Sequence, residues 1–429
     1  MPPTGKYKGW KRMALPKMTR IQQQFEAPVL TDLPAAIHTE LDRINAATLV
    51  RPGETVAITA GSRGVANVDI AVKATVDYLK GLGAKPFVVP AMGSHGGATA
   101  EGQRSVLAHY GITEETVGAP VKATMEVVEL GKTADGLPVF FDRYAAEADH
   151  VVPLNRIKAH TDFNGSIESG LMKMMVIGLG KQQGANLYHR AFFQYSFEHV
   201  IMAVGGFILD TGKIAFGLGL IENAHEDTAK AVAMPAAHLL QNERELLVEA
   251  KSLMGQLPFD ELDLLIVDWT GKNISGTGMD TNVIGRMMQN FEPEPAKPAI
   301  LRIFVRDLTE ESDGNATGIG LADFTTTRLV DKIDRHSTYM NGITALGPQK
   351  SKIPFYYDTD REAIEVALDT IGLTEPEDAR VIRIESTLRL TELDISDVLL
   401  EDAKLHSRLE VIGETQPFEF DTVGNLLPF

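Results

Sequence analysis

One segment of the sequence, residues 155–190, gathers most of the side chains that could do chemistry. It reads NRIKAHTDFNGSIESGLMKMMVIGLGKQQGANLYHR and holds five Lys or Arg and two acidic residues, a net charge of +3 in a chain whose formal charge is −17. It also contains His160, His189 and Lys173, the last within the apolar run 171–177. Positive charge in a glycine-rich segment favours binding of phosphate or carboxylate groups. We therefore expect an anion-binding or catalytic site here.

Two further candidates follow predicted strands near the start of the chain. A β-rich run, 55–59, leads into the sequence GSRG, which contains Arg63, and a second run, 85–89, leads into a glycine-rich loop that contains His95. The helical pattern between the two runs makes them successive strands of one parallel sheet. Such connections are right-handed, so both loops leave the same sheet edge, where ligands bind in open α/β folds. We therefore expect Arg63 and His95 to share one crevice.

Each of these residues also has an ordinary structural explanation, because single histidines at strand ends and lysines in apolar helices are common without catalytic roles. The well-known motifs do not explain them: the sequence has no GxxxxGK[ST], HExxH or GxSxG, and the glycines around His95 lack GxGxxG spacing. An ordinary nicotinamide dehydrogenase is therefore disfavoured. The gathering of all candidates at predicted sheet edges is what favours a functional site.

The composition excludes several classes of protein. None of the 429 residues is cysteine, which excludes a disulfide scaffold, a thiolate zinc site, a cysteine-ligated iron–sulfur cluster and a cysteine nucleophile. The charge of −17 argues against binding of nucleic acid or anionic lipid. No apolar stretch is long enough to span a membrane, and the basic N-terminus lacks the apolar core of a secretory signal. We therefore expect a cytoplasmic protein.

Strand-like and helix-like patterns alternate along the chain, which predicts an α/β protein with mainly parallel sheets. A strand at 150–154 leads into the segment 155–190, and a long helical pattern runs between residues 229 and 255. A second α/β set then begins, with strands at 262–267, 300–305 and 381–384. We expect two α/β domains, residues 1–258 and 259–429, with the active site in the cleft between them and a C-terminal tail that could return to the first domain.

The sequence resembles the lactate racemase family, whose members use a nickel-pincer nucleotide. The resemblance rests on the order of Arg63, His95, His160, Lys173 and His189. It implies that Lys173 carries the cofactor covalently and that His189, sixteen residues later, ligates nickel. It also implies that His95 and His160 act as acid and base, and that Arg63 holds the substrate carboxylate.

The resemblance also implies the cofactor and the reaction. The loop of Gly61, Ser62 and Arg63 would help to bind pyridinium-3,5-bisthiocarboxylic acid mononucleotide nickel, whose sulfur atoms supply the soft donors that a chain without cysteine lacks. The α-hydrogen of a 2-hydroxy acid would leave as hydride while a histidine takes the hydroxyl proton, which avoids a carbanion beside the carboxylate. Two histidines suit racemisation, because imidazole has an unperturbed pKa of about 6.5 and each enantiomer needs its own base.

Several positions differ from the family pattern and change the expected substrate. Ala60 stands where lactate racemase has an aspartate. If Asp280 is a shared aspartate, Gly285 and Met288 occupy the positions of a substrate-binding glutamine and lysine. We therefore expect a racemase or C2-epimerase for a 2-hydroxy acid other than lactate. The candidate replacement ligands are Lys272, Asn282 and Arg286.

Other functions remain open at this point. Lys272 and Asn282 would suit the extra hydroxyl groups of a sugar acid, as in a gluconate-type 2-epimerase, whereas Arg286 would suit a dicarboxylate such as malate. A non-catalytic protein that binds a nucleotide or anion would leave the paired histidines unexplained. The expected partners are a small anionic 2-hydroxy acid and, transiently, cofactor maturation proteins, and the oligomeric state is open.

Overall fold

A computed structural model describes residues 13–62 and 64–429 and divides into two compact units. The first unit comprises residues 26–254, and the second comprises residues 255–429 together with residues 13–25. This differs from the predicted division after residue 258, which assigned the N-terminus to the first domain. The reason is that β1 (Lys17–Gln23) pairs antiparallel with β15 (Glu392–Ser396), a long-range contact that no local pattern reveals.

The first unit is built on parallel strands whose carboxyl ends carry the candidate residues. Strands β2 (Thr55–Ala60), β3 (Lys85–Pro90) and β6 (His150–Val152) form a parallel sheet in the order β3-β2-β6. Strands β7 (Leu154–Arg156), β8 (Phe216–Glu222) and β9 (Thr228–Pro235) form a second group, with β7 and β8 parallel. Backbone hydrogen bonds from Val151 to residues 213 and 215 join the two groups.

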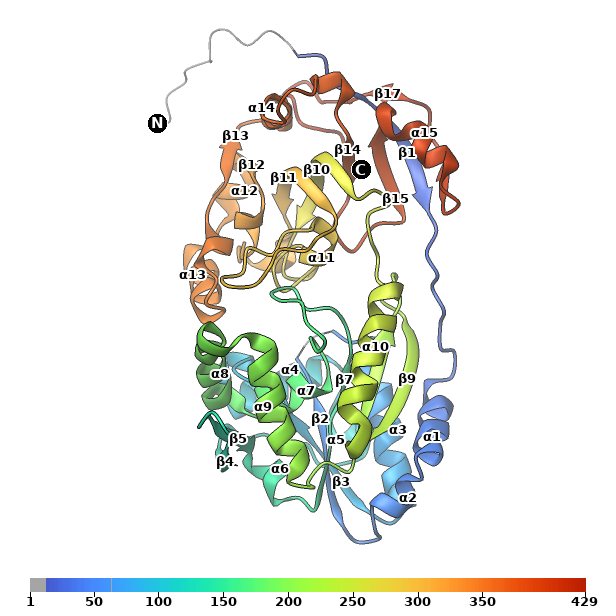
Figure 1. The fold of residues 1–429 in the computed structure, drawn as a ribbon, viewed down its shortest axis with the longest axis vertical. Helices are drawn as coiled ribbons and strands as arrows, with labels where there is room; N and C mark the ends of the chain where they lie inside the picture. The colour runs from blue at the N-terminus through green and yellow to red at the C-terminus, as the bar shows by residue number, and fades with distance from the viewer. Residues whose placement is uncertain (1–12, 63) are drawn as a thin grey trace. The chain divides into compact units, whose positions relative to one another are not determined.

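Helices cover both faces of these strands. Alternate residues of β2 point into opposite cores: Val56 and Ile58 pack with α1 and α3, whereas Ala57 packs in the core that contains α8 and α9. Figure 1 shows α1 and α3 on one side of the strands and α8 and α9 on the other. The helices are α1 (Leu33–Arg43), α2 (Ala46–Leu49), α3 (Val68–Gly81), α4 (Ala100–His109), α5 (Glu114–Val117), α6 (Arg143–Glu147), α7 (Leu171–Lys173), α8 (Lys181–Tyr195), α9 (Phe197–Asp210) and α10 (Leu239–Leu253), and a hairpin is formed by β4 (Val127–Lys132) and β5 (Pro138–Asp142).

The sequence patterns predict most of these elements, with one clear failure. The strands at 55–59 and 85–89 are confirmed, and Thr99 begins α4 by accepting a hydrogen bond from Gly102 N at 3.0 Å. The helix between residues 229 and 255 is only half right, because its first part is strand β9 and only α10 is helical. The alanine-rich β9 sequence favours helix, but its antiparallel pairing with β8 overrides that preference.

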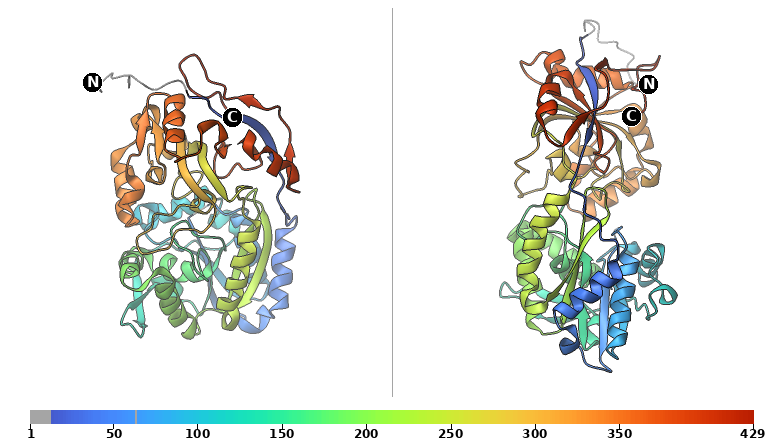
Figure 2. Two further views of the ribbon diagram at one scale, coloured as in Figure 1. Left: turned by 45° about the horizontal axis from the view of Figure 1, so that its top comes forward. Right: turned by 90° about the vertical axis from the view of Figure 1, so that its right-hand side faces the viewer.

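The second unit contains one large sheet in the order β13-β12-β11-β10-β14-β15-β1-β16. The strands from β13 to β14 are parallel, and β15, β1 and β16 add antiparallel pairs. Figure 2 shows β1 running beside the C-terminal strands of this unit. The chain's tail stays in the same unit, where Leu426 N donates to Asp360 Oδ2 at 2.9 Å. Two α/β units with mainly parallel sheets confirm the predicted fold class.

The bounds in the second unit follow the predicted strands closely. Its strands are β10 (Glu261–Thr270), β11 (Ala299–Leu308), β12 (Phe324–Thr326), β13 (Phe355–Tyr357), β14 (Val381–Ile384), β16 (Leu409–Val411) and β17 (Gln416–Pro417). Its helices are α11 (Thr281–Ile284), α12 (Thr327–Lys332), α13 (Arg335–Thr344), α14 (Asp360–Asp369) and α15 (Leu400–Leu405). Across residues 13–62 and 64–429, no helix has the length and apolar character needed to cross a membrane.

Candidate active site

Lys173 lies where three helical segments succeed one another. Helix α7 ends at Lys173, a π-helical turn follows at Met174–Gly178, and α8 begins at Lys181. A π-helical turn widens a helix locally and is frequent at functional sites. The Lys173 side chain is half-buried, and its Nζ lies 5.9 Å from the centre of the Phe197 ring. The Lys173 side chain therefore lies against the Phe197 ring and is only partly exposed to solvent.

The loop that carries His160 is folded around the buried carboxylate of Glu168. Glu168 Oε2 accepts from His160 N at 2.7 Å, Oε1 accepts from Gly165 N at 3.0 Å, and Lys251 Nζ lies 2.5 Å from Oε1. The side chain of Glu168 has no exposed surface, and its charge is balanced by Lys251 from α10. Glu168 therefore closes the loop and sets the direction in which His160 points.

The His160 ring contacts Lys173 directly. Its Nε2 is hydrogen-bonded to Lys173 Nζ, and its Nδ1 accepts from Asp162 N at 2.9 Å. Because Nδ1 accepts a hydrogen bond, a neutral His160 carries its proton on Nε2, and Nε2 can then donate only to an uncharged Lys173 amine. The ring also packs 4.2 Å from Phe163, centre to centre. The predicted acid/base residue and the predicted lysine are thus brought together from positions thirteen residues apart.

His189 joins this group from α8. Burial, together with the positive charge of Lys173, lowers the pKa of His189 to about 4, and Asp162 acts in the opposite direction. Those electrostatic interactions place Lys173, Asp162 and His189 in one neighbourhood, and the His189 ring meets Phe192 edge-on at 5.4 Å. A buried imidazole that stays neutral has a lone pair available for a metal ion.

We expect the His189 imidazole to remain neutral down to about pH 4 in the folded protein. The unfolded chain binds that proton at its ordinary pKa of about 6.5, so this residue makes the fold less stable as the pH falls from about 6.5 to about 4. A titration of the histidine signals by ¹⁵N NMR, with His189→Gln to assign the signal, checks this. A His189 midpoint near 6.5 would contradict the burial on which the argument rests.

The loops after β2 and β3 meet the π-helical turn that follows Lys173. Ser62 Oγ is hydrogen-bonded to His95 Nδ1, which joins the two loops to each other. A methyl group added at Gly61 would lie 3.2 Å from Met174 Cε, and Gly93 N donates to Gly178 O at 3.2 Å. Gly61, Ser62 and His95 therefore lie at the sheet edge beside the lysine helix, as predicted. Arg63 lies outside the described residues.

The three candidates in the second unit have different surroundings. Arg286 donates to Asp323 Oδ2 at 2.9 Å and to the Leu321 carbonyl at 2.8 Å, and its other nitrogen faces the Ile300 carbonyl. The Arg286 guanidinium is thus hydrogen-bonded within the second unit. These contacts give no support to the hypothesis that Arg286 binds a dicarboxylate substrate.

Asn282 and Lys272 are engaged locally in the second unit. The Asn282 amide donates to Asp280 Oδ1 at 3.0 Å, within the cap of α11. Lys272 Nζ donates to Asn341 Oδ1 at 2.7 Å and to the Gly276 carbonyl. Their roles as substrate ligands remain predictions.

Sequence reasoning missed the acidic residues that support the site. In the sequence, Glu168 is only one of two negative charges in the segment 155–190, and no motif singles out Glu243. Glu243 on α10 is buried, and its Oε2 accepts from Met172 N at 3.0 Å at the start of α7. Its position on the apolar face of a helix indicates that Glu243 is buried. The helical pattern does not show which groups its carboxyl contacts, so it is weak evidence for a role in the site.

The donor set near Lys173 fits a metal that is carried by a prosthetic group. In the part of the chain that the structure describes, no three His, Asp or Glu side chains are grouped to hold a metal ion. A metal bound by protein side chains alone needs about four ligands, or three in an open catalytic site. Lys173 offers one amine for covalent attachment, and His189 offers one neutral nitrogen donor. Most of the ligands would have to come from the bound group itself.

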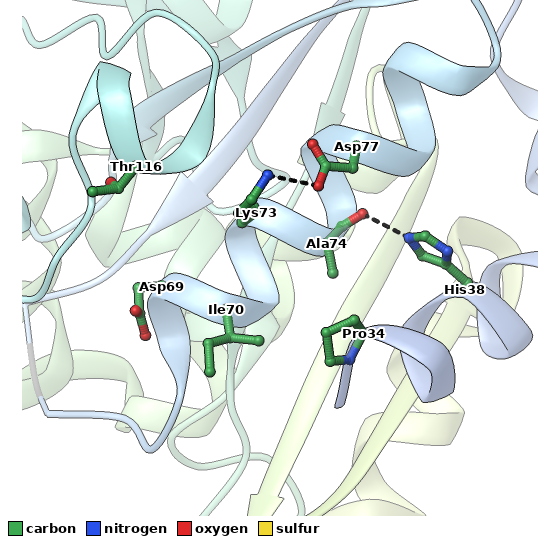
Figure 3. Close-up of a pocket in the computed structure, with 8 residues that line it drawn as sticks. All are labelled: Pro34, His38, Asp69, Ile70, Lys73, Ala74, Asp77 and Thr116. Carbon is green, nitrogen blue, oxygen red and sulfur yellow. Dashed lines mark hydrogen bonds and ion pairs between the residues drawn. The ribbon is translucent and has the colours of Figure 1, made fainter. Parts of the chain in front are cut away.

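A pocket elsewhere in the first unit contains none of these residues. Figure 3 shows this pocket, of about 190 Å³, between α1 and α3. Several of its polar groups are engaged with each other or with the backbone, with Lys73 Nζ 2.8 Å from Asp77 Oδ2 and His38 Nε2 3.2 Å from the Ala74 carbonyl. The chemistry-bearing residues are therefore gathered at the sheet edge and not in this pocket.

The first unit is thus an α/β domain that brings a lysine and three histidines to neighbouring positions beside its parallel strands. Residues 16–199 match the family described as the lactate racemase N-terminal domain, which confirms the resemblance seen in the sequence. No curated protein matches the chain.

Two solved structures share the fold. The lactate racemase apoprotein from Thermoanaerobacterium thermosaccharolyticum is 13% identical, with a TM-score of 0.52, covering 86% of this chain and 94% of that one. A protein from Thermotoga maritima is 11% identical, also with a TM-score of 0.52, covering 86% of this chain and 99% of that one. At such identities the likeness concerns the fold alone.

Proposed function

We propose that this protein is a racemase or C2-epimerase of a 2-hydroxy acid that works by hydride transfer with a nickel-pincer nucleotide attached to Lys173. The observation that carries the proposal is the contact between Lys173 Nζ and His160 Nε2, with the buried, neutral His189 close by. The match of residues 16–199 to the lactate racemase N-terminal domain supports the same reaction class. A binding protein without catalysis would not need a histidine at the tethering amine.

Lys173 and His189 would hold the cofactor. When bound, the nickel-pincer nucleotide would supply the acceptor and donor of the hydride. Lys173 fixes the group by a covalent bond through Nζ, and His189 offers its neutral nitrogen to the nickel. The aromatic side chains around Lys173, among them Phe163 and Phe197, exclude water from this part of the site.

His95 and His160 would move the hydroxyl proton of the substrate. For His160 to accept a proton on Nε2, its Nδ1 must carry a hydrogen, and the Asp162 carboxylate, 3.9 Å from Nδ1, is the acceptor at hand. After a small change in the conformation of residues 160–162, Nδ1 would donate to the Asp162 carboxylate instead of accepting from the Asp162 amide. Ser62 stands in the same relation to His95 Nδ1 and can donate to it or accept from it. Each histidine therefore has a partner that can set its tautomer.

The substrate would be an anion other than lactate. Arg63 would bind its carboxylate through two parallel hydrogen bonds. The departures at Ala60, Gly285 and Met288 argue against lactate, and the structural use of Arg286 leaves a sugar acid as the second candidate. Asn282 and Lys272, the latter hydrogen-bonded to Asn341, would bind the extra hydroxyl groups of such a substrate. Transient binding of maturation proteins and a cytoplasmic location are part of this proposal.

The proposal is tested with protein co-produced with the pincer-cofactor maturation enzymes. Enantiopure 2-hydroxy acids and sugar acids deuterated at the α-carbon are supplied, and we expect isomerisation of at least one of them with the deuterium retained. His95→Ala and His160→Ala should each lower kcat by about 10²–10⁴-fold, the usual contribution of a positioned acid or base. The control is His199→Ala, because His199 is half-exposed and paired with Asp135.

Different outcomes separate the candidate functions. Isomerisation of sugar acids alone would select the epimerase. Loss of deuterium to solvent would indicate that the α-hydrogen leaves as a proton and not as hydride. Tight binding of the cofactor with no turnover of any substrate in this panel would favour the non-catalytic binding protein, and full activity of His160→Ala would overturn the assignment of that residue.

A further inference from the structure

Lys181 is a fully buried cation at the start of α8. Its side chain has no exposed surface, and its Nζ lies 2.9 Å from Asp142 Oδ2 and 3.2 Å from Gln103 Oε1, and also donates to the Pro90 carbonyl. These partners come from the end of β5, from α4 and from the end of β3. Lys181 thus donates two hydrogen bonds, to Gln103 and Pro90, and forms a buried ion pair with Asp142.

Gln103 extends this cluster to the loop that carries His95. It is fully buried, and its Nε2 donates to the Gly93 carbonyl at 2.8 Å and to the His95 carbonyl at 3.3 Å. The same loop is held on its other side, where Gly93 N donates to Gly178 O at 3.2 Å. The His95 loop is therefore held by side-chain and backbone contacts to α4 and to the turn after Lys173.

Two features distinguish this cluster from ordinary packing. Replacing a buried ion pair with well-packed apolar side chains often leaves the stability of a protein unchanged or increases it. Stability alone therefore does not explain why Lys181 and Asp142 are buried here. Burial lowers the pKa of Lys181, and the charge of Asp142 only partly offsets this. Lys181 also has φ +52°, in the left-handed region that a lysine rarely adopts. Strain of this kind persists where the surrounding structure enforces it.

We propose that Lys181 is a positioning residue that, with Asp142 and Gln103, fixes the His95 loop and the start of α8 in one arrangement. His189 lies on α8 about two turns after Lys181, so the same cluster sets the spacing between the two histidines. The catalytic value of that spacing rests on the proposed function. The positioning itself does not, and it can be measured in the protein without cofactor.

The test uses hydrogen–deuterium exchange, read by mass spectrometry, on the full chain. Gln103→Met removes the donor to the His95 loop but leaves Lys181 its contacts with Asp142 and Pro90. We expect amides of residues 91–98 to exchange about tenfold faster or more. Lys181→Met should produce the same effect there and also faster exchange in residues 181–189. With loaded enzyme, both variants should lower kcat more than they change KM.

Two controls separate positioning from general stability. Tyr188→Phe on the same helix removes a hydroxyl that accepts from Phe140 N at 2.9 Å and donates to Pro138 O at 3.0 Å. It should lower the Tm without changing exchange in residues 91–98. The double variant Lys181→Met/Asp142→Asn removes both charges and keeps the Asp142 acceptor for Ala145 N. It should recover much of the Tm while the His95 loop still exchanges fast.

The outcomes leave the proposal and the proposed function separately testable. Lys181 would be shown only to stabilise the fold by either of two results. One is recovery of loop protection in the double variant, and the other is exchange of residues 91–98 in Tyr188→Phe that is as fast as in Lys181→Met. Absence of turnover in the wild-type protein would refute the racemase assignment without altering the exchange result. Fast loop exchange together with unchanged kcat in loaded enzyme would remove the functional part of the inference.

Discussion

Lys173→Ala is expected to abolish the covalent adduct and to lower turnover by about 10⁴-fold or more, to the level of the uncatalysed reaction. The amine at this position is the only group in the proposal that fixes the cofactor by a bond, and it lies directly against His160. Peptide mass spectrometry of protein co-produced with the maturation enzymes should show the added mass on the peptide that contains Lys173 in the wild-type protein and nowhere in the variant. Nickel content should fall with it, since His189 alone is a single ligand.

Two further substitutions sharpen the Lys173 result. Lys173→Arg keeps a cation of similar length but has a guanidinium that stays protonated and does not form the amide-type bond, so it should behave like Lys173→Ala. Lys230→Ala is the control, because Lys230 is half-exposed and paired with Glu249 on the surface. An adduct that persists in Lys173→Arg, or that maps to another lysine, would refute the tether assigned here.

Glu243→Gln is expected to stabilise the protein at alkaline pH and to have much less effect at acid pH. Burial raises the pKa of Glu243 to about 8, although the amides of Met172 and Leu171 act in the opposite direction. The folded protein therefore binds a proton on Glu243 more tightly than the unfolded chain, in which the pKa is about 4.3. The stability that comes from this proton is fully present below about pH 4 and is lost as the pH rises through about 8.

The size of the Glu243 effect follows from the shift in pKa. At about 1.4 kcal/mol for each pKa unit, its upper limit is on the order of 5 kcal/mol between acid and alkaline pH. Urea unfolding of wild type and Glu243→Gln at pH 5 and pH 8.5 measures the difference, and the exposed neighbour Glu245→Gln on α10 serves as the control. A difference between wild type and Glu243→Gln that is independent of pH would show that Glu243 is ionised in the folded state throughout.

The Glu243 result also bears on the site. Its carboxyl accepts from Met172 N, one residue before Lys173, and a methyl group at Gly170 would lie 2.1 Å from Glu243 Oε1. The start of the lysine helix therefore fits closely around this side chain. Loss of the proton at high pH would place a buried charge at that point, so the environment of Lys173 should change over the same pH range as the stability.

Much of the architecture follows from local patterns in the sequence. Runs of β-branched and apolar residues at 55–59, 85–89 and 381–384 are strands in the structure, because a parallel strand buried on both faces has few other sequences available to it. The alternation of such runs with helical patterns then determines the α/β class. It also places His95 and Ser62 at one sheet edge, since right-handed connections bring both loops to the same side.

Long-range pairing is where the local patterns fail. The segment 228–235 has the composition of a helix but becomes strand β9 through its pairing with β8. The N-terminal strand β1 pairs with β15, about 370 residues along the chain, so residues 13–25 belong to the second unit. Both outcomes depend on partners that are distant in the sequence, whose geometry no local window contains.

The sequence by itself determined the fold class, the positive segment 155–190 and the order of Lys173 and its three histidines. Only the tertiary structure decided that Lys173 touches His160, that Arg286 is hydrogen-bonded to Asp323, and that Glu168 and Lys181 are buried beneath the site. The physical reason is burial. Residue type and spacing give the chemistry that a side chain can do, but the protonation, orientation and partners of that side chain depend on what surrounds it in the folded chain.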